Sequence, residues 1–265
     1  MSANILDLDN LRLAVLIDAE NVPRNCIKSV MEEIAIYGIP TIKRIYGDWT
    51  SPVVSGWKTP LLENAITPVQ QYSYTTGKNS SDSAMIIDAM DILYTEKTDG
   101  FVIVSSDSDF TRLAIRLREA GQRVIGIGEK KTPSAFKAAC DKFTYIEVIR
   151  ANAEEPKGES ADDSQKTPVQ QREKQQSQPR PRKIPADVVQ IIADSIADLA
   201  DDNGSVFMGD LGNLILKKQP DFDSRNFGYK SLSAMIKSIT RFDLDFRQTS
   251  DPHIKHVFVR DKEAS

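Results

Sequence analysis

The sequence predicts an α/β protein in which a doubly wound, mostly parallel sheet forms a first domain and a winged helix-turn-helix forms a second, smaller domain. Over residues 1–150, short β-branched apolar runs alternate with segments whose apolar residues recur at helical spacing. This alternation is typical of a parallel sheet with helices on both faces. Residues 151–182 are polar, and residues 183–265 then show three helical patterns followed by a hairpin pattern. We therefore expect two domains joined by a linker.

The central strand of the first domain is expected at Phe101–Val104, because four consecutive apolar residues are typical of a strand that is buried on both faces. The other elements follow from the same patterns. We expect strands at 12–17, 42–48, 66–72, 101–104, 122–128 and 145–149, and helices at 25–36, within 49–62, and at 82–93, 110–118 and 134–139.

Acidic residues stand where these strands end or helices begin. Asp18 follows the first strand, Asp107 and Asp109 follow the central strand, and Asp82 opens a helix. The carboxyl ends of parallel strands meet at one edge of a sheet, where ligands bind. Neighbouring carboxylates repel each other, and a divalent cation stabilises them. These four residues therefore predict a Mg²⁺ or Mn²⁺ site that could serve phosphodiester hydrolysis. The alternative is a set of unrelated helix caps.

Composition narrows the classes of function. The chain has 265 residues, of which 40% are hydrophobic, and a net charge of −4, so it lacks the overall basic character of many nucleic-acid binders. No apolar run reaches the roughly 18 residues of a membrane span. The N-terminus lacks the features of a signal peptide, and we expect a cytoplasmic protein with no membrane partner. Both histidines, His253 and His256, lie outside the first domain. Histidine-based catalysis is therefore unavailable there, which favours a metal mechanism.

Three motifs give the first domain a family resemblance. They are DAEN at 18–21, GKNSSD at 77–82 and SSDSDF at 105–110. In combination they resemble the NYN domain, a branch of the PIN-like nucleases, over roughly residues 10–150. The resemblance implies that the four acids are catalytic metal ligands and that the substrate is RNA. The preference for RNA over DNA rests on this resemblance.

The resemblance also implies substrate contacts. Asn21 would orient a ligand or the scissile phosphate, Lys78 would pair with a phosphate, and Ser106 would contact the substrate. Asp88 matches an acid often found in the family's helix. It lies 6 residues after Asp82, about 240° around a helix, so we expect it to face away from Asp82.

Two rival motifs occur in the same domain. Asp107, Asp109 and Thr111 also fit the DxDxT nucleophile loop of haloacid dehalogenase-like phosphatases. That loop usually follows the first strand and needs further downstream residues, whereas here it follows a late strand. Gly126 and Gly128 follow another strand but lack the third glycine of a dinucleotide fingerprint.

The linker and the second domain complete the prediction. Residues 151–182 have almost no large apolar residues, so we expect a disordered tether. Beyond it, helices are expected at 185–199, 209–217 and 231–239, and hairpin strands at 242–246 and 254–259. Residues 187–260, and above all DFDSRNFGYKSL at 221–232, resemble the OST-HTH/LOTUS domain. That family binds RNA, and some members bind protein partners such as helicases.

The resemblance places RNA binding on the third helix and its approach. The residues expected to carry it are Arg225, Asn226, Tyr229, Lys230 and Lys237, whereas Phe227 is expected to pack in the core. The sequence thus predicts a metal-dependent endoribonuclease with a tethered RNA-binding domain. The alternatives are a non-catalytic RNA-binding scaffold protein and, ranked lower, a DxDxT phosphatase. Self-association into a homodimer is left open.

Overall fold

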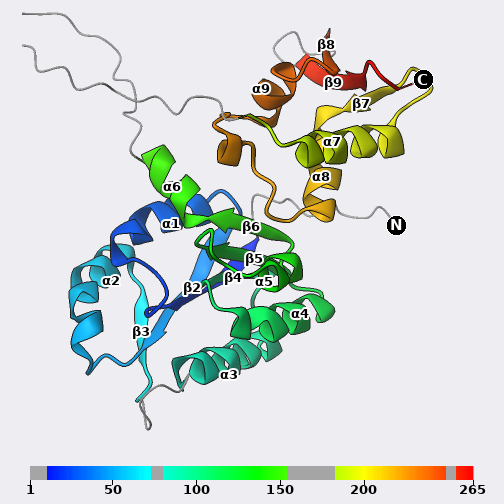
Figure 1. Cartoon of the computed structure of the whole chain (residues 1–265). Coiled ribbons are helices and arrows are strands. Elements are labelled where there is room, and N and C mark those ends of the chain that lie inside the picture. The colour runs from blue at the N-terminus through cyan, green and yellow to red at the C-terminus, as the bar shows by residue number, and fades with distance from the viewer. Residues whose placement is uncertain (1–10, 73–79, 154–182, 249–254, 265) are drawn as a thin grey trace, which may run out of the picture. The chain divides into compact units, whose positions relative to one another are not determined.

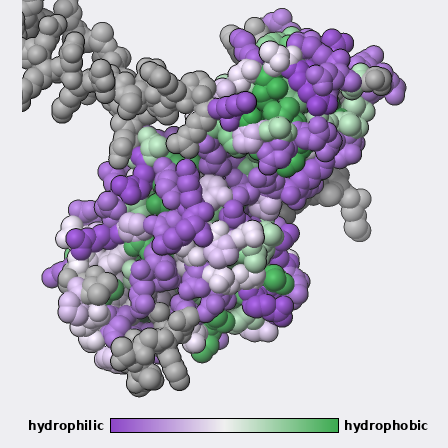
Figure 2. All heavy atoms as spheres, in the orientation of Figure 1, coloured by the Kyte–Doolittle hydropathy of each residue, from purple (hydrophilic) through white to green (hydrophobic). Residues whose placement is uncertain are grey.

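The computed structural model describes residues 11–72, 80–153, 183–248 and 255–264. It contains two compact units, which we describe separately (Figure 1). The predicted tether lies outside the described residues, apart from 151–153, which end a helix. None of the helices in the described ranges is both long and apolar enough to span a bilayer. The face of the first unit shown in Figure 2 is mostly hydrophilic.

The first unit contains a six-stranded sheet in which every pairing is parallel. The strands are β1 Arg12–Asp18, β2 Ile39–Gly47, β3 Thr67–Gln70, β4 Gly100–Val104, β5 Arg123–Gly128 and β6 Lys142–Tyr145. Their order is β3-β2-β1-β4-β5-β6. The chain therefore builds the sheet outward from β1 in one direction and from β4 in the other, and the order reverses between these two neighbours. This confirms the predicted doubly wound sheet.

Helices cover both faces of this sheet (Figure 1). They are α1 Ile27–Ile34, α2 Lys58–Asn64, α3 Ser80–Tyr94, α4 Thr111–Glu119, α5 Ser134–Ala139 and α6 Ile146–Ala153. Alternate residues of a strand point to opposite faces. Val15 and Val102 accordingly pack with α1, α2 and α6, whereas Leu16 and Ile103 pack with α3, α4 and α5. The central strands are buried on both sides, which accounts for their continuous apolar runs.

The prediction of a last strand at 145–149 is wrong. The strand is β6, Lys142–Tyr145, in which Phe143 and Thr144 are buried beside β5. Helix α6 begins at Ile146, and it buries Ile146 and Ile149 on one side. Residues three apart share a helix face, and a short apolar run does not distinguish a strand from a helix by its periodicity.

The second unit has the predicted winged-helix composition. Its elements are α7 Ala186–Leu199, β7 Ser205–Phe207, α8 Met208–Lys218, α9 Leu232–Lys237, β8 Phe242–Gln248 and β9 Lys255–Asp261. The strands form an antiparallel sheet in the order β7-β9-β8. Strands β8 and β9 pair as the expected hairpin, and residues 249–254 between them lie outside the described residues.

Candidate metal centre

Asp18 is the last residue of β1 and is 2% exposed. Its Oδ1 accepts hydrogen bonds from the backbone N–H groups of Glu20 at 3.0 Å and Asn21 at 3.3 Å. Its Oδ2 accepts from the Asn21 side-chain amide at 2.7 Å and from the Ser105 hydroxyl at 2.9 Å. Both oxygens are thus held in fixed directions. In the structure Asn21 orients the Asp18 carboxylate, and its contact with a substrate stays a prediction.

Ser105 links the ends of two neighbouring strands. It is fully buried and follows β4 directly, and the preceding Val104 pairs with Ile17 of β1. The Ser105 hydroxyl donates to Asp18 Oδ2 and accepts from the backbone N–H of Asp107 at 3.1 Å. The sequence prediction missed this residue. The available signal was a serine placed between a buried strand and an acidic pair.

Asp107 and Asp109 lie on the turn that follows β4. Asp107 caps the short 3₁₀ helix Ser108–Phe110, and its Oδ1 accepts from the backbone N–H of Asp109 at 2.9 Å. Phe110 is fully buried and fixes this turn against the sheet, whereas Asp109 is exposed. The helix-cap alternative is therefore correct for one oxygen of Asp107. Because a carboxylate has two oxygens, this does not remove it from a metal site.

Asp82 lies in the first turn of α3 and is 7% exposed. One carboxylate oxygen from each of Asp82, Asp107 and Asp109 lies within 4.8 Å of the other two. Asp18 does not belong to this group of three. Burial, followed by the negative charges of Asp18, Asp107, Asp109 and Glu20, raises the pKa of Asp82 to about 7. The site thus concentrates negative charge around a nearly buried carboxyl group.

The position and chemistry of this cluster fit a divalent cation. The strand order reverses between β1 and β4. In a doubly wound sheet, ligands bind in the crevice at the carboxyl ends of such a pair of strands. Three carboxylates offer the hard oxygen donors that Mg²⁺ and Mn²⁺ prefer. Whether Asp18, Asp82, Asp107 and Asp109 act in catalysis stays a prediction.

The remaining predicted residues of this domain fall at different places. The Ser106 hydroxyl accepts from the backbone N–H of Glu129 at 2.9 Å, and Ser106 is 8% exposed. Lys78 lies outside the described residues. Asp88, which we expected to face away from Asp82, accepts hydrogen bonds from Arg44 and the Tyr46 hydroxyl and thereby joins α3 to β2.

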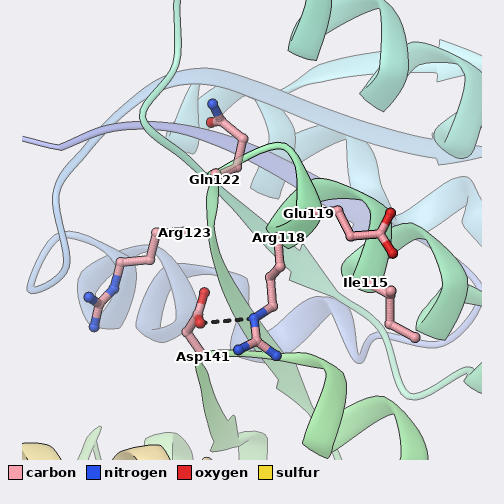
Figure 3. Close-up of a pocket in the computed structure, with 7 residues that line it drawn as sticks. Ile115, Arg118, Glu119, Gln122, Arg123 and Asp141 are labelled. Atoms are coloured by element: carbon pink, nitrogen blue, oxygen red, sulfur yellow. Dashed lines mark ion pairs between the residues drawn. The ribbon is translucent and has the colours of Figure 1, made fainter.

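A hollow of about 620 Å³ lies elsewhere on this unit (Figure 3). Its lining includes Arg118, Gln122, Arg123 and Asp141, and the Arg118 guanidinium pairs with Asp141 at 2.9 Å. Arg123 begins β5, so this hollow is at the amino edge of the sheet, away from the acids at the carboxyl edge.

The predicted RNA-binding residues of the second unit differ in their surroundings. Arg225 pairs with the Asp223 carboxylate at 2.7 Å, and the Tyr229 oxygen receives a hydrogen bond from Ser238 at 2.8 Å. Lys230 and Lys237 are exposed, whereas Asn226 and Phe227 are half-buried. The role of these residues in RNA binding stays a prediction.

The chain was compared with known families. A family model described as the NYN domain matches residues 12–147, just over half of the chain. This chain belongs to the NYN domain family. The NYN match is followed by a match to the OST-HTH/LOTUS domain at residues 179–254. Both predicted resemblances are confirmed in this order. The six-stranded parallel sheet agrees with the PIN-like fold of NYN domains, and an OST-HTH domain is of a kind that binds RNA.

The NYN chain is also similar to solved structures. A protein of unknown function from Vibrio parahaemolyticus is 18% identical with a TM-score of 0.45, and the match covers 55% of this chain and 96% of that one. An uncharacterized protein from Nitrosomonas europaea is 29% identical with a TM-score of 0.29, and the match covers 40% of this chain and 95% of the other. No curated protein matches the chain.

Proposed function

We propose that this NYN protein is a metal-dependent endoribonuclease and that its OST-HTH domain binds the RNA. The observation that carries the proposal is the approach of Asp82, Asp107 and Asp109 within 4.8 Å at the point where the sheet order reverses. A group of carboxylates there suits a hard divalent cation, which offsets the repulsion between their negative charges.

The four acids have two proposed parts. Asp82, Asp107 and Asp109 would hold Mg²⁺ or Mn²⁺. Asp18, whose two oxygens accept hydrogen bonds from Asn21 and Ser105, would contribute fixed negative charge beside them. A bound divalent cation would activate water and stabilise the leaving oxygen of the phosphodiester. Asp82, Asp107 and Asp109 would fix the position of that cation. The residues proposed to contact the RNA are Asn21, Lys78 and Ser106.

The proposal is tested by incubating the full chain with a labelled single-stranded RNA in Mn²⁺ or Mg²⁺. We expect internal cleavage that stops in EDTA and resumes when the metal is restored in excess. A matched single-stranded DNA probe tests the preference for RNA. If RNA is bound but never cut with either metal, the protein is the RNA-binding scaffold instead.

The phosphatase alternative makes a different prediction. It requires Asp107 to attack phosphorus from a loop that usually follows the first strand, whereas in this chain Asp107 follows β4. Release of phosphate from small monoesters, with a covalent intermediate that Asp107→Asn abolishes, would favour that alternative over the nuclease.

A further inference from the structure

The sheet of the second unit carries aromatic and cationic side chains on one face. Phe207 of β7 and Asp245 of β8 both pair with Phe258 of the central strand β9, and Arg247 pairs with His256. Residues directly opposite one another share a face, as do residues two apart on a strand. Phe207, His256, Phe258 and Arg247 therefore lie together, and we call this surface the aromatic face.

The opposite face of the same sheet is the core side. Val259 is 1% exposed and Asp261 is 6% exposed, and both alternate with the residues of the aromatic face along β9. Phe207 by contrast is 37% exposed, and His256 is also exposed. The aromatic rings are thus not explained by packing in the core.

The side chains of the aromatic face are held in place by their neighbours. The Phe207 ring centroid lies 5.2 Å from that of His256 and 5.9 Å from that of Phe258. A Cβ added at Gly209 would lie 2.7 Å from Phe207 Cε1, so the glycine makes room for this ring. The Arg247 guanidinium carbon lies 4.0 Å from the Phe258 centroid. An exposed ring that is already fixed loses little conformational entropy when a ligand binds.

The chemistry of the aromatic face fits single-stranded nucleic acid. Unstacked bases stack on aromatic rings and on guanidinium planes, whatever their sequence. Arg247 forms an ion pair with Asp245, and Arg260 and Lys262 both pair with Asp243, so the charges around this face nearly balance and do not exclude a phosphate backbone. The described strand positions on this face include no aliphatic residue, which disfavours an apolar anchor from a protein partner.

We propose that the aromatic face binds unstacked bases of single-stranded RNA, with Phe207 and His256 as the exposed stacking surfaces and Arg247 beside them. This inference rests on the proposed RNA binding by the OST-HTH domain and adds a second surface to the one expected at α9. The two surfaces would contact different parts of the RNA. Lys230 and Lys237, which lie just before and at the end of α9, would contact phosphates, and the aromatic face would contact bases.

The test uses the full chain in EDTA, so that binding is measured without cleavage. The probe is a fluorescein-labelled, unstructured single-stranded RNA, compared with an abasic oligonucleotide that has the same ribose-phosphate backbone. Phe207→Ala removes one stacking contact, so we expect it to weaken binding to the RNA about 5- to 100-fold at every salt concentration. The slope of affinity against salt should not change, because no phosphate contact is lost. Phe207→Trp should restore binding.

Phe246→Ala is the matched control. Phe246 is 58% exposed on β8 but pairs with Val257, and it therefore lies on the opposite face of the sheet. This variant should bind RNA like the wild type. On the abasic probe, wild type and Phe207→Ala should bind equally, because no base is present to stack.

Two results would overturn the inference. One is binding of the RNA by Phe207→Ala at wild-type strength, which would leave a protein ligand as the occupant of this face. The other is an equal loss on the RNA and the abasic probe, since that loss would not involve bases. If the wild-type chain itself fails to bind RNA, the proposed RNA-binding function fails first, and the two failures are therefore distinguishable.

Discussion

At the scale of single residues, the hydroxyl of Ser105 is the connection between Asp18 and Asp107. The fully buried hydroxyl donates a hydrogen bond to the Asp18 carboxylate and accepts one from the backbone N–H of Asp107. Asp18 and the Asp107 turn are therefore oriented by a side chain within the core.

Ser105→Ala should lower kcat for RNA cleavage, because it removes the bonds that orient Asp18 and the Asp107 turn. Removing such a supporting hydrogen bond typically costs about 10- to 100-fold in activity or metal affinity. The measurement is a kcat and KM comparison with a Mn²⁺ titration. KM should change little, and the exposed Ser134→Ala is the control. Wild-type kcat in Ser105→Ala would contradict this positioning role.

Asp82 makes the stability of the metal-free protein depend on pH. Burial and the neighbouring carboxylates raise its folded-state pKa to about 7. Between about pH 4 and pH 7, therefore, the folded state holds a proton that the unfolded state has already released. Stability therefore falls as pH rises through this range, by roughly 2–4 kcal/mol for this group alone. Addition of a divalent cation should reverse the loss at high pH.

Asp82→Asn should therefore raise the Tm of the NYN domain in EDTA at pH 8 by several degrees and change it little at pH 4. The same variant should lose RNA cleavage, because the amide is a poorer ligand for a hard cation. Thermal denaturation at both pH values checks this. An equal Tm shift at the two pH values would show that charge repulsion is not the cause.

At the scale of elements, helix α3 is attached to β2 by a small polar network. Asp88 of α3 accepts hydrogen bonds from Arg44 and from the Tyr46 hydroxyl. Tyr46 is 1% exposed, and burial together with the Asp88 charge raises its pKa, so it remains a neutral donor. Because the first turn of α3 carries Asp82, this network also supports the helix that holds Asp82 at the proposed centre.

Asp88→Ala should destabilise the NYN domain by about 1–3 kcal/mol, because it leaves the buried Tyr46 hydroxyl without its acceptor. Tyr46→Phe, which removes the donor as well as its need for a partner, should cost less. Chemical denaturation measures both. Asp91→Ala, an exposed change on the same helix, should be close to wild type. An Asp88→Ala protein as stable as Asp91→Ala would rule out this bracing role.

The elements of the sheet were largely predictable because burial on both faces leaves a strong signal. The run Phe101–Val104 is too short for a helix between its neighbouring helical segments, and β4, Gly100–Val104, confirms the predicted strand. Residues 145–149 do not form the expected strand, because a short apolar run fits the period of a strand or of a helix. Pairing with β5 decides between the two structures: residues 142–145 form the strand, and α6 begins at Ile146.

The proposed centre was predictable only in part. Asp18, Asp82, Asp107 and Asp109 were expected to meet at one edge of the sheet; oxygens of the last three lie within 4.8 Å of one another, whereas Asp18 does not belong to that group. The two hydrogen bonds of Ser105 and the enclosure of Asp18 by Asn21 and Ser105 depend on loop geometry, which residue spacing does not determine. The pairing of Arg225 with Asp223 was likewise not visible from sequence.

At the scale of the whole molecule, the account divides two tasks between two domains of one chain. The NYN domain would cut RNA and the OST-HTH domain would hold it, and the covalent connection between them would raise the effective concentration of bound RNA at the acids. Binding and cleavage should therefore respond separately to substitution.

Lys230→Ala should weaken RNA binding and flatten its salt dependence, because one phosphate contact and its released counterion are lost. Cleavage at saturating RNA should remain at the wild-type rate. Fluorescence anisotropy at several salt concentrations, together with single-turnover cleavage, separates the two effects. The exposed Lys28→Ala of α1 is the control, and unchanged binding by Lys230→Ala would exclude this lysine from the RNA surface.

The most direct test of the account is cleavage of a labelled single-stranded RNA in Mn²⁺ by the wild type, Asp107→Asn and Glu63→Gln. Glu63 is an exposed carboxylate of α2, so its variant matches the chemical change away from the proposed centre. We predict that the wild type and Glu63→Gln cut the RNA and that Asp107→Asn binds it without cutting. Cleavage by Asp107→Asn at the wild-type rate, with EDTA still blocking it, would place the metal centre elsewhere and contradict the account.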